Sequence, residues 1–222
     1  MKLWEKIFIG IGIVLSIFII ITIRKFVIYT NLNYLNKEQQ NIGNIYCKFT
    51  TEGQIIETYT KGNIKKSVLK NNSKIITQIT KPDYWIVYED DGVNKTRTKQ
   101  FPKKTETYIV SESENKIPNY ADFTILFEKI WSSICSSIRT ETVDGQDYYV
   151  ISGHNVNFVY LENTKNVKVY INKNTGLAYK KIETIKENGN IRDKISTFEY
   201  KFNVVTDEDV AELDEQEYKI KN

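Results

Sequence analysis

The sequence predicts an α+β protein in which an N-terminal transmembrane helix precedes one large, strongly curved antiparallel sheet with a helix packed across it. Three observations predict this class. The chain starts with an uncharged apolar run, most of the remaining chain reads as short strands separated by turn residues, and one later stretch alone has a helical period.

The apolar run Ile7–Ile23 contains 17 residues without a charge, between Lys6 and Arg24. A membrane span needs about 20 residues, and Trp4 together with Phe26–Tyr29 can lengthen this one at the two interfaces. The alternative is a cleaved signal peptide. It is disfavoured because no small-residue cleavage pattern follows the run, and the first cysteine lies far downstream. We therefore expect an uncleaved anchor.

The charges around the span decide its orientation only weakly, since two lysines precede it and an arginine and a lysine follow it. A short N-terminal tail before a single span most often stays in the cytoplasm. We therefore expect a single-pass protein of the cell membrane with its large domain extracytoplasmic.

The formal net charge of +3 arises within the first 30 residues, where four basic residues face one acid. The remaining chain is balanced, and residues 206–222 carry seven acids against two lysines. Without a domain-wide basic field, nucleic-acid binding is disfavoured. The expected organisation is an anchor over 1–30, an extracytoplasmic domain over 31–205 and an acidic tail over 206–222.

A short helix over Leu32–Asn41 is expected to continue from the membrane. The strand-like runs after it are rich in Ile, Val, Thr and Tyr and are separated by turn signals such as Lys61-Gly62-Asn63. The expected strands of this half are Asn44–Thr51, Gln54–Thr60, Ile64–Leu69, Lys74–Thr80, Tyr84–Tyr88, Thr96–Phe101 and Thr107–Ser111.

Apolar residues then recur every three or four positions across Tyr120–Arg139, which predicts an amphipathic helix starting near Pro118. Strands resume beyond it. Residues 172–176 and 187–190 read as hairpin turns, with Gly176 at a positive φ. The expected strands here are Asp147–Ser152, Val156–Leu161, Val167–Ile171, Leu177–Ile185 and Ile191–Val205.

Residues 167–210 resemble the closing hairpins of the lipoprotein-carrier superfamily, which includes LolA, LolB, the RseB-type regulators and the LppX/LprG lipid carriers. Residues 63–92 resemble its paired strands. The order and spacing of the motifs carry the resemblance, and the matching residues are Asn172, Thr175, Gly176, Leu177, Lys181, Phe198, Tyr200, Phe202 and Asn203.

The resemblance implies an incompletely closed antiparallel barrel with a helical lid over an apolar cavity. Such cavities accept acyl chains in carriers and serve as sensing or docking surfaces in regulators. This chain departs from the usual carriers through its transmembrane anchor. A tethered domain cannot ferry cargo far, which favours sensing, local lipid handover or partnership within a membrane complex.

Few residues suggest catalysis or metal binding. The one histidine, His154, follows a glycine between two expected strands and reads as a turn residue, so an enzyme with His154 as base is the least favoured class. No cofactor or metal is expected, because no cluster of ligands has suitable spacing. Cys47 and Cys135 either pair or stay as two unpaired thiols.

A basic strand, defined by Lys95, Arg97 and Lys99, places three cations on one face. It reads either as a solvated edge strand or as a surface for contact with anionic lipid headgroups or wall polymers.

The leading hypothesis is a non-catalytic binding domain that holds a lipid, an acyl chain or a lipoprotein segment. Its expected partners are a lipid or lipidated protein and the bilayer. The alternative is a regulatory or structural subunit with a filled core that docks another membrane protein through its sheet. The expected cavity wall is Tyr84, Trp85, Phe123, Phe127, Ile130, Trp131, Ile134 and Phe158.

Overall fold

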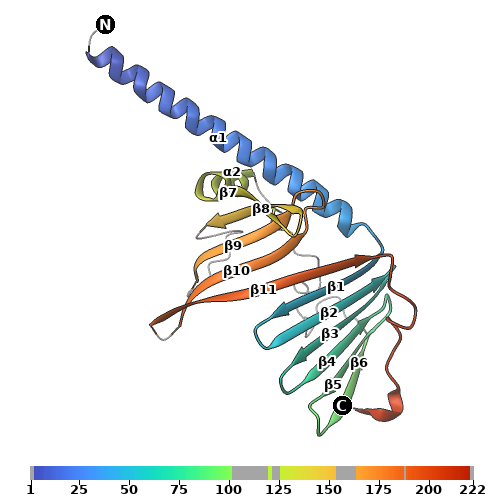
Figure 1. The fold of residues 1–222 in the computed structure, drawn as a ribbon. Helices are drawn as coiled ribbons and strands as arrows, with labels where there is room; N and C mark the ends of the chain where they lie inside the picture. Colours follow the sequence, from blue (N-terminus) through green and yellow to red (C-terminus); the bar gives the residue numbers. More distant parts are fainter. Residues whose placement is uncertain (1–2, 102–119, 122–125, 154–163, 188, 221–222) are drawn as a thin grey trace. The chain divides into compact units, whose positions relative to one another are not determined.

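The computed structural model describes residues 3–101, 120–121, 126–153, 164–187 and 189–220 (Figure 1). Its first element is α1 (Leu3–Gln40), a single helix of 38 residues. By length and composition, α1 is able to cross a membrane. The expected apolar run and the expected helix from Leu32 are both part of it. Helix α1 ends just before Gly43, and the first strand starts at Asn44.

Six strands follow as an antiparallel meander. Two-residue turns connect β1 to β2 and β2 to β3, and Gly53 and Gly62 have positive φ in them, as expected of hairpins whose turns twist with the strands. The strands are β1 (Asn44–Thr51), β2 (Gln54–Lys61), β3 (Ile64–Asn71), β4 (Ile75–Thr80), β5 (Trp85–Asp90) and β6 (Lys95–Gln100). They match six of the expected strands closely. The seventh, Thr107–Ser111, lies outside the described residues.

Helix α2 (Leu126–Cys135) ends earlier than the periodicity predicts. The predicted helix includes Ile138 and Arg139, but these residues belong to strand β7 (Ser137–Val143). The physical reason is the β-hairpin that this strand opens. Residues 137–143 pair with β8, and the turn Asp144-Gly145 has positive φ at both positions, which is the geometry of a type I′ hairpin.

The remaining strands are β8 (Gln146–Gly153), β9 (Thr164–Asn172), β10 (Ala178–Glu187), β11 (Asn190–Phe202) and the short β12 (Lys219–Ile220). The predicted last strand continues to Val205, whereas β11 ends at Phe202. It ends there because Asn203 adopts a positive φ of 59°, which an extended strand cannot accommodate. The expected strand Val156–Leu161 lies outside the described residues.

The described strands belong to one sheet with the order β12-β6-β5-β4-β3-β2-β1-β11-β10-β9-β8-β7. The pairings described are antiparallel, apart from the parallel pair of β12 with β6. The order is linear, so the sheet does not close on itself. The α+β class with an N-terminal apolar helix and a large, unclosed, mostly antiparallel sheet is confirmed, whereas the strong curvature and the helical lid stay predictions.

The chain divides into two compact units. Unit 1 comprises Met1–Asn36, Asn119–Leu177 and Glu183–Arg192, and it contains α2, β7, β8 and β9. Unit 2 comprises Lys37–Pro118, Ala178–Ile182 and Asp193–Asn222, and it contains β1 to β6. The boundaries expected at residues 30 and 205 remain predictions.

Each unit has its own buried residues. In unit 1, Val167, Val169 and Ile171 of β9 are buried in alternation, as expected of a strand with one covered face. In unit 2, four consecutive residues of β5, Trp85–Tyr88, are buried, so both faces of the sheet are covered at this strand. This part of unit 2 is therefore a filled core.

Candidate functional site

The second half of α1 is held in unit 1. The residues of its first half are exposed, including Val14 at 66% and Ile20 at 65%, whereas Tyr29, Leu32 and Asn36 are almost fully buried. The Lys25 ammonium donates a hydrogen bond of 2.5 Å to the carbonyl of Ser136, and the Tyr29 hydroxyl donates one of 2.9 Å to Ser136 Oγ. Helix α1 is therefore part of the structure of unit 1 from about Lys25 onward.

The turn between β9 and β10 lies directly against α1. Gly176 has a φ of +68°, which confirms the expected positive φ. A Cβ at this position would lie 2.6 Å from the carbonyl oxygen of Leu32 and 2.7 Å from the amide nitrogen of Asn36. Glycine is therefore required twice here, once by the turn and once by the helix backbone that lies against it.

Three of the expected wall residues lie on α2, and all three are exposed: Ile130 at 40%, Trp131 at 48% and Ile134 at 38%. They share one face of this helix, so the amphipathic pattern is confirmed for the described residues. Phe123 and Phe158 lie outside the described residues, as does the side chain of Phe127.

The two expected wall residues in unit 2 belong to different clusters. Trp85 is 5% exposed and packs with Ile76 and Val87. Tyr84 instead packs against a second cluster, formed by Ile79, Ile86 and Tyr88, which we call the Tyr88 cluster. Adjacent residues of an extended chain point to opposite faces, which explains the separation. The structure therefore does not bring Tyr84 and Trp85 together on one surface.

A surface hollow of about 490 Å³ lies between the β3–β4 and β5–β6 turns of unit 2. It is lined by residues 71–75 and 90–92, which are mostly polar and include Lys74, Asp90 and Asp91. None of the expected wall residues lines it. This hollow does not fit an acyl chain, and the expected apolar cavity stays a prediction.

The basic strand corresponds to β6, and the acidic C-terminal residues lie against it. Lys95 forms ion pairs with Glu217 at 3.0 Å and with Asp90 at 3.8 Å, and Arg97 pairs with Glu215. Lys99 lies 3.9 Å above the centre of the Tyr84 ring. Two of the three expected surface cations are therefore paired with the chain's own acids, which weakens the attraction of this face for anionic surfaces.

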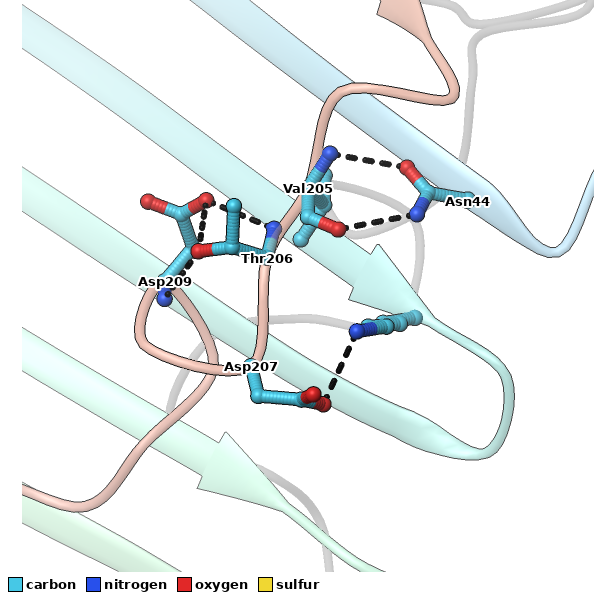
Figure 2. Close-up of polar contacts among 6 residues, drawn as sticks. Asn44, Val205, Thr206, Asp207 and Asp209 are labelled. Carbon is cyan, nitrogen blue, oxygen red and sulfur yellow. Dashed lines mark hydrogen bonds and ion pairs between the residues drawn. The ribbon is translucent and has the colours of Figure 1, made fainter.

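We call residues 203–220 the C-terminal strap. Figure 2 shows its start, where the Asn44 side chain donates to the carbonyl of Val205 at 2.9 Å and accepts from the amide of Val205 at 2.8 Å. Lys61 pairs with Asp207 at 2.9 Å, and Asp209 accepts two hydrogen bonds from Thr206. The start of the strap is therefore fixed within unit 2 by the pair of hydrogen bonds between the Asn44 side chain and the Val205 backbone and by the Lys61–Asp207 ion pair.

The strap continues over the Tyr88 cluster. Leu213 and Tyr218 pack against its buried residues, and the Tyr218 and Tyr88 rings meet edge to face at 5.0 Å. The Glu212 carboxylate accepts hydrogen bonds from Lys81 and from Tyr84, the latter at 2.6 Å. Burial opposes the charge of Glu212, but these two hydrogen bonds and the Lys81 charge together lower the pKa of its carboxyl.

Catalytic and metal-binding groups are sparse in the part of the chain that the structure describes. His154 lies outside it. Within the described ranges, no three His, Cys, Asp or Glu side chains form a group suited to a metal. Cys47 and Cys135 are both free thiols. Burial raises the pKa of the Cys47 thiol to about 12, with a small opposing effect from Lys65, so this cysteine is a poor nucleophile.

No family model matches the chain, and no curated protein matches it. The solved structures similar to it include an uncharacterized conserved protein of Thermus thermophilus (7% identity, TM-score 0.48, 86% of this chain and 98% of that one). They also include the lipoprotein LppX of Mycobacterium tuberculosis (10%, 0.43, 82% and 97%) and a LolA superfamily protein of Nitrosomonas europaea (12%, 0.26, 81% and 96%). The last of these proteins is a member of the superfamily that the sequence resembles. TM-scores below 0.5 do not indicate what the chain binds, so its function depends on its own residues.

Sequence reasoning missed two parts of this arrangement. The first is the contact between α1 and α2 through Ser136, for which the sequence contains no local signal. The second is the packing of the strap, which the sequence presents only as an acidic tail. The alternation of Glu212, Asp214 and Glu217 with Leu213 and Tyr218 was the available signal, because apolar residues within an acidic segment suggest packing.

Proposed function

We propose that this chain is a membrane-anchored, extracytoplasmic, non-catalytic binding domain that holds a lipid, an acyl chain or a lipoprotein segment. The observation that carries the proposal is the change along α1. Its first half is apolar and exposed, which is costly in water, whereas one face of its second half, formed by Tyr29, Leu32 and Asn36, is buried in unit 1. A helix of this kind suits a domain held directly at the bilayer surface.

The exposed apolar face of α2 supports the lipid-binding part of the proposal. A folded domain rarely exposes a tryptophan and two isoleucines together unless they meet a partner or a lipid. The anchor limits the reach of the domain, so the ligand would come from the membrane in which the chain is held. Local uptake and handover fit this arrangement better than long-range carriage.

The proposal is tested on the full chain extracted in mild detergent. Native mass spectrometry is expected to detect a retained lipid or fatty acid, and the delipidated chain is expected to take up a fluorescent fatty acid. Trp131→Ala should weaken this uptake. Val93→Ala is the matched control, because Val93 is an apolar residue that is 88% exposed in the β5–β6 turn. A wild-type chain that retains no lipid and takes up no fatty acid would exclude lipid binding.

One observation favours the alternative of a docking subunit. Strand β7 lies at the end of the sheet and, among the described strands, pairs only with β8, so its outer edge offers backbone groups to a partner strand. The filled core at β5 agrees with this reading. Thr140→Pro, within β7, removes an amide that points away from β8. It would weaken the recruitment of a partner protein if the edge were used, and it would leave fatty-acid uptake unchanged.

A further inference from the structure

Helix α2 buries its polar face and exposes its apolar face, which is the reverse of a helix in a water-soluble domain. Ser132, Ser133 and Ser136 are 4%, 0% and 8% exposed, whereas Ile130, Trp131 and Ile134 are 38–48% exposed. The hydroxyls of Ser133 and Ser136 donate to carbonyls one turn earlier in the same helix, at 2.7 and 2.5 Å, so they remain satisfied when buried. In water, the apolar face would be expected to face the protein.

The serine face is covered by unit 1 itself. Tyr29 and Lys25 of α1 bind Ser136, and the backbone of Gly153 at the end of β8 lies against Cys135 and Ser136. Small residues such as serine permit this close approach. The apolar face therefore points away from the serine side, and the described residues leave it exposed.

Lys129 of α2 and Ser136, one residue after this helix ends, contact the same short stretch of α1. The Lys129 ammonium lies 4.7 Å from the centre of the Phe26 ring, and seven residues later Ser136 binds Lys25 and Tyr29. If two helices packed side by side along their length, two residues seven apart on one helix would contact residues about seven apart on the other. Helix α2 therefore crosses α1 at one level, and Figure 1 shows it beside the middle of α1.

That level coincides with the end of the apolar span. The uncharged run Ile7–Ile23 is about 25 Å long at 1.5 Å per residue. A hydrocarbon core of about 30 Å therefore ends a few residues beyond Ile23. This is the stretch Arg24–Tyr29, where α2 crosses. If α1 spans a bilayer, a helix that crosses it there lies in the plane of the membrane surface.

We propose that α2 is an interfacial helix, and that Ile130, Trp131 and Ile134 lie among the lipid chains at the bilayer surface. The inference rests on the membrane anchoring in the proposed function. The lipid that this face meets first is the bilayer itself, from which the proposed ligand would be taken up. Tryptophan is enriched at this depth, and apolar faces of such helices sink about 5–10 Å into the boundary between headgroups and chains. Lys25, Lys129 and Arg24 lie at the headgroup level, where cations meet phosphates.

Helix α2 contains its own labelling site. Cys135 is exposed and lies one turn after Trp131, near the apolar face. The full chain with Cys47→Ala is labelled at Cys135 with an environment-sensitive fluorophore and reconstituted into vesicles of phosphatidylethanolamine and phosphatidylglycerol. Some of the lipids carry a nitroxide quencher either near the headgroup or near the chain end. A second protein with Cys47→Ala, Cys135→Ser and Ile13→Cys reports on the middle of the span.

We expect the label at Cys135 to be quenched most by the nitroxide near the headgroup, and the label at Ile13→Cys by the deep nitroxide. Replacing Trp131 and Ile134 by serine should abolish quenching at Cys135. The exposed positions make this variant compatible with folding, which an unchanged melting temperature checks. Quenching at position 13 without quenching at Cys135 would overturn the interfacial helix and leave the anchor intact. Absence of quenching at both positions would overturn the anchor as well.

Discussion

The side-chain amide of Asn36 donates a hydrogen bond of 3.0 Å to the carbonyl of Gly176, so that α1 is joined to a turn 140 residues away. Asn36 is fully buried, and so is its neighbour along this face, Leu32. Because Gly176 has no side chain, its backbone also lies directly against the backbone of α1 at Leu32 and Asn36. The junction between the apolar helix and unit 1 therefore depends on one glycine and one amide.

Replacing Gly176 by alanine tests this junction. The new Cβ would meet backbone atoms of Leu32 and Asn36 at 2.6 and 2.7 Å, and neither can move without moving α1. Positive φ alone costs about 1–2 kcal/mol for alanine, and overpacking adds roughly 1–3 kcal/mol. We expect a lower melting temperature of the full chain in detergent.

Gly62→Ala is the matched control for that experiment. Gly62 also has a positive φ, of 59°, but a Cβ there would meet nothing within 4 Å. It should cost only about 1–2 kcal/mol. Equal losses of stability in the two variants would contradict the close packing of the turn against α1.

Two tryptophans provide a second matched pair. Trp131 is 48% exposed and Trp85 is 5% exposed. Trp85→Ala leaves a cavity in the cluster with Ile76 and Val87 and should cost about 3–5 kcal/mol. Trp131→Ala should cost clearly less, because about half of the Trp131 surface is already exposed, while it lowers fatty-acid uptake. Chemical denaturation of both variants measures the difference. A loss of several kcal/mol at Trp131 would instead indicate a filled contact over α2.

The two cysteines should differ in reactivity. The raised pKa of Cys47, about 12, keeps its thiol protonated near neutral pH, and the thiolate is the species that reacts. Cys135 is exposed. In detergent at neutral pH, a maleimide should therefore modify the chain once rapidly, at Cys135, and a second time only after unfolding. Intact mass and peptide mapping give the order. Rapid modification of Cys47 would show that β1 is more open than the structure indicates.

The C-terminal strap should loosen in acid. Hydrogen bonds from Thr206 lower the pKa of Asp209, and those from Lys81 and Tyr84 lower the pKa of Glu212 against the effect of burial. Carboxyl groups with a lowered folded pKa stabilise the bound strap above their unfolded values of about 4, and this stabilisation is lost as the pH falls through the folded values. The Asn44 contacts do not titrate, so release should begin beyond Val205.

A fluorophore at Ile220→Cys, in a chain with Cys47→Ala and Cys135→Ser, reports on this release through its anisotropy. The anisotropy should fall between about pH 5 and about pH 2. Glu212→Gln should shift the fall toward neutral pH, because it removes the charge that Lys81 binds. An anisotropy independent of pH across this range would show that the strap is held by Leu213, Tyr218 and Asn44 alone.

Local patterns were sufficient for much of the fold. The uncharged run at Ile7–Ile23, the alternating strands and the glycine turns predict α1, the meander from β1 to β6 and the positive φ of Gly176, because each depends on neighbouring residues only. The same patterns misplaced the end of α2. Ile138 continues the helical spacing of Ile130 and Ile134, and the Asp144-Gly145 hairpin overrides it.

Tertiary structure decided which face of each element is covered. The periodicity of Ile130, Trp131 and Ile134 identifies an apolar stripe, but a stripe that faces a core and one that faces lipid have the same spacing. Only the packing of α1 and Gly153 on the serine side shows that the apolar side points outward. Likewise, the charges of Lys95 and Arg97 are visible in the sequence, whereas their neutralisation depends on where Glu215 and Glu217 return, over 100 residues later. Contacts between distant segments carry no local signal, and it is these contacts that determine what the surface offers to a ligand.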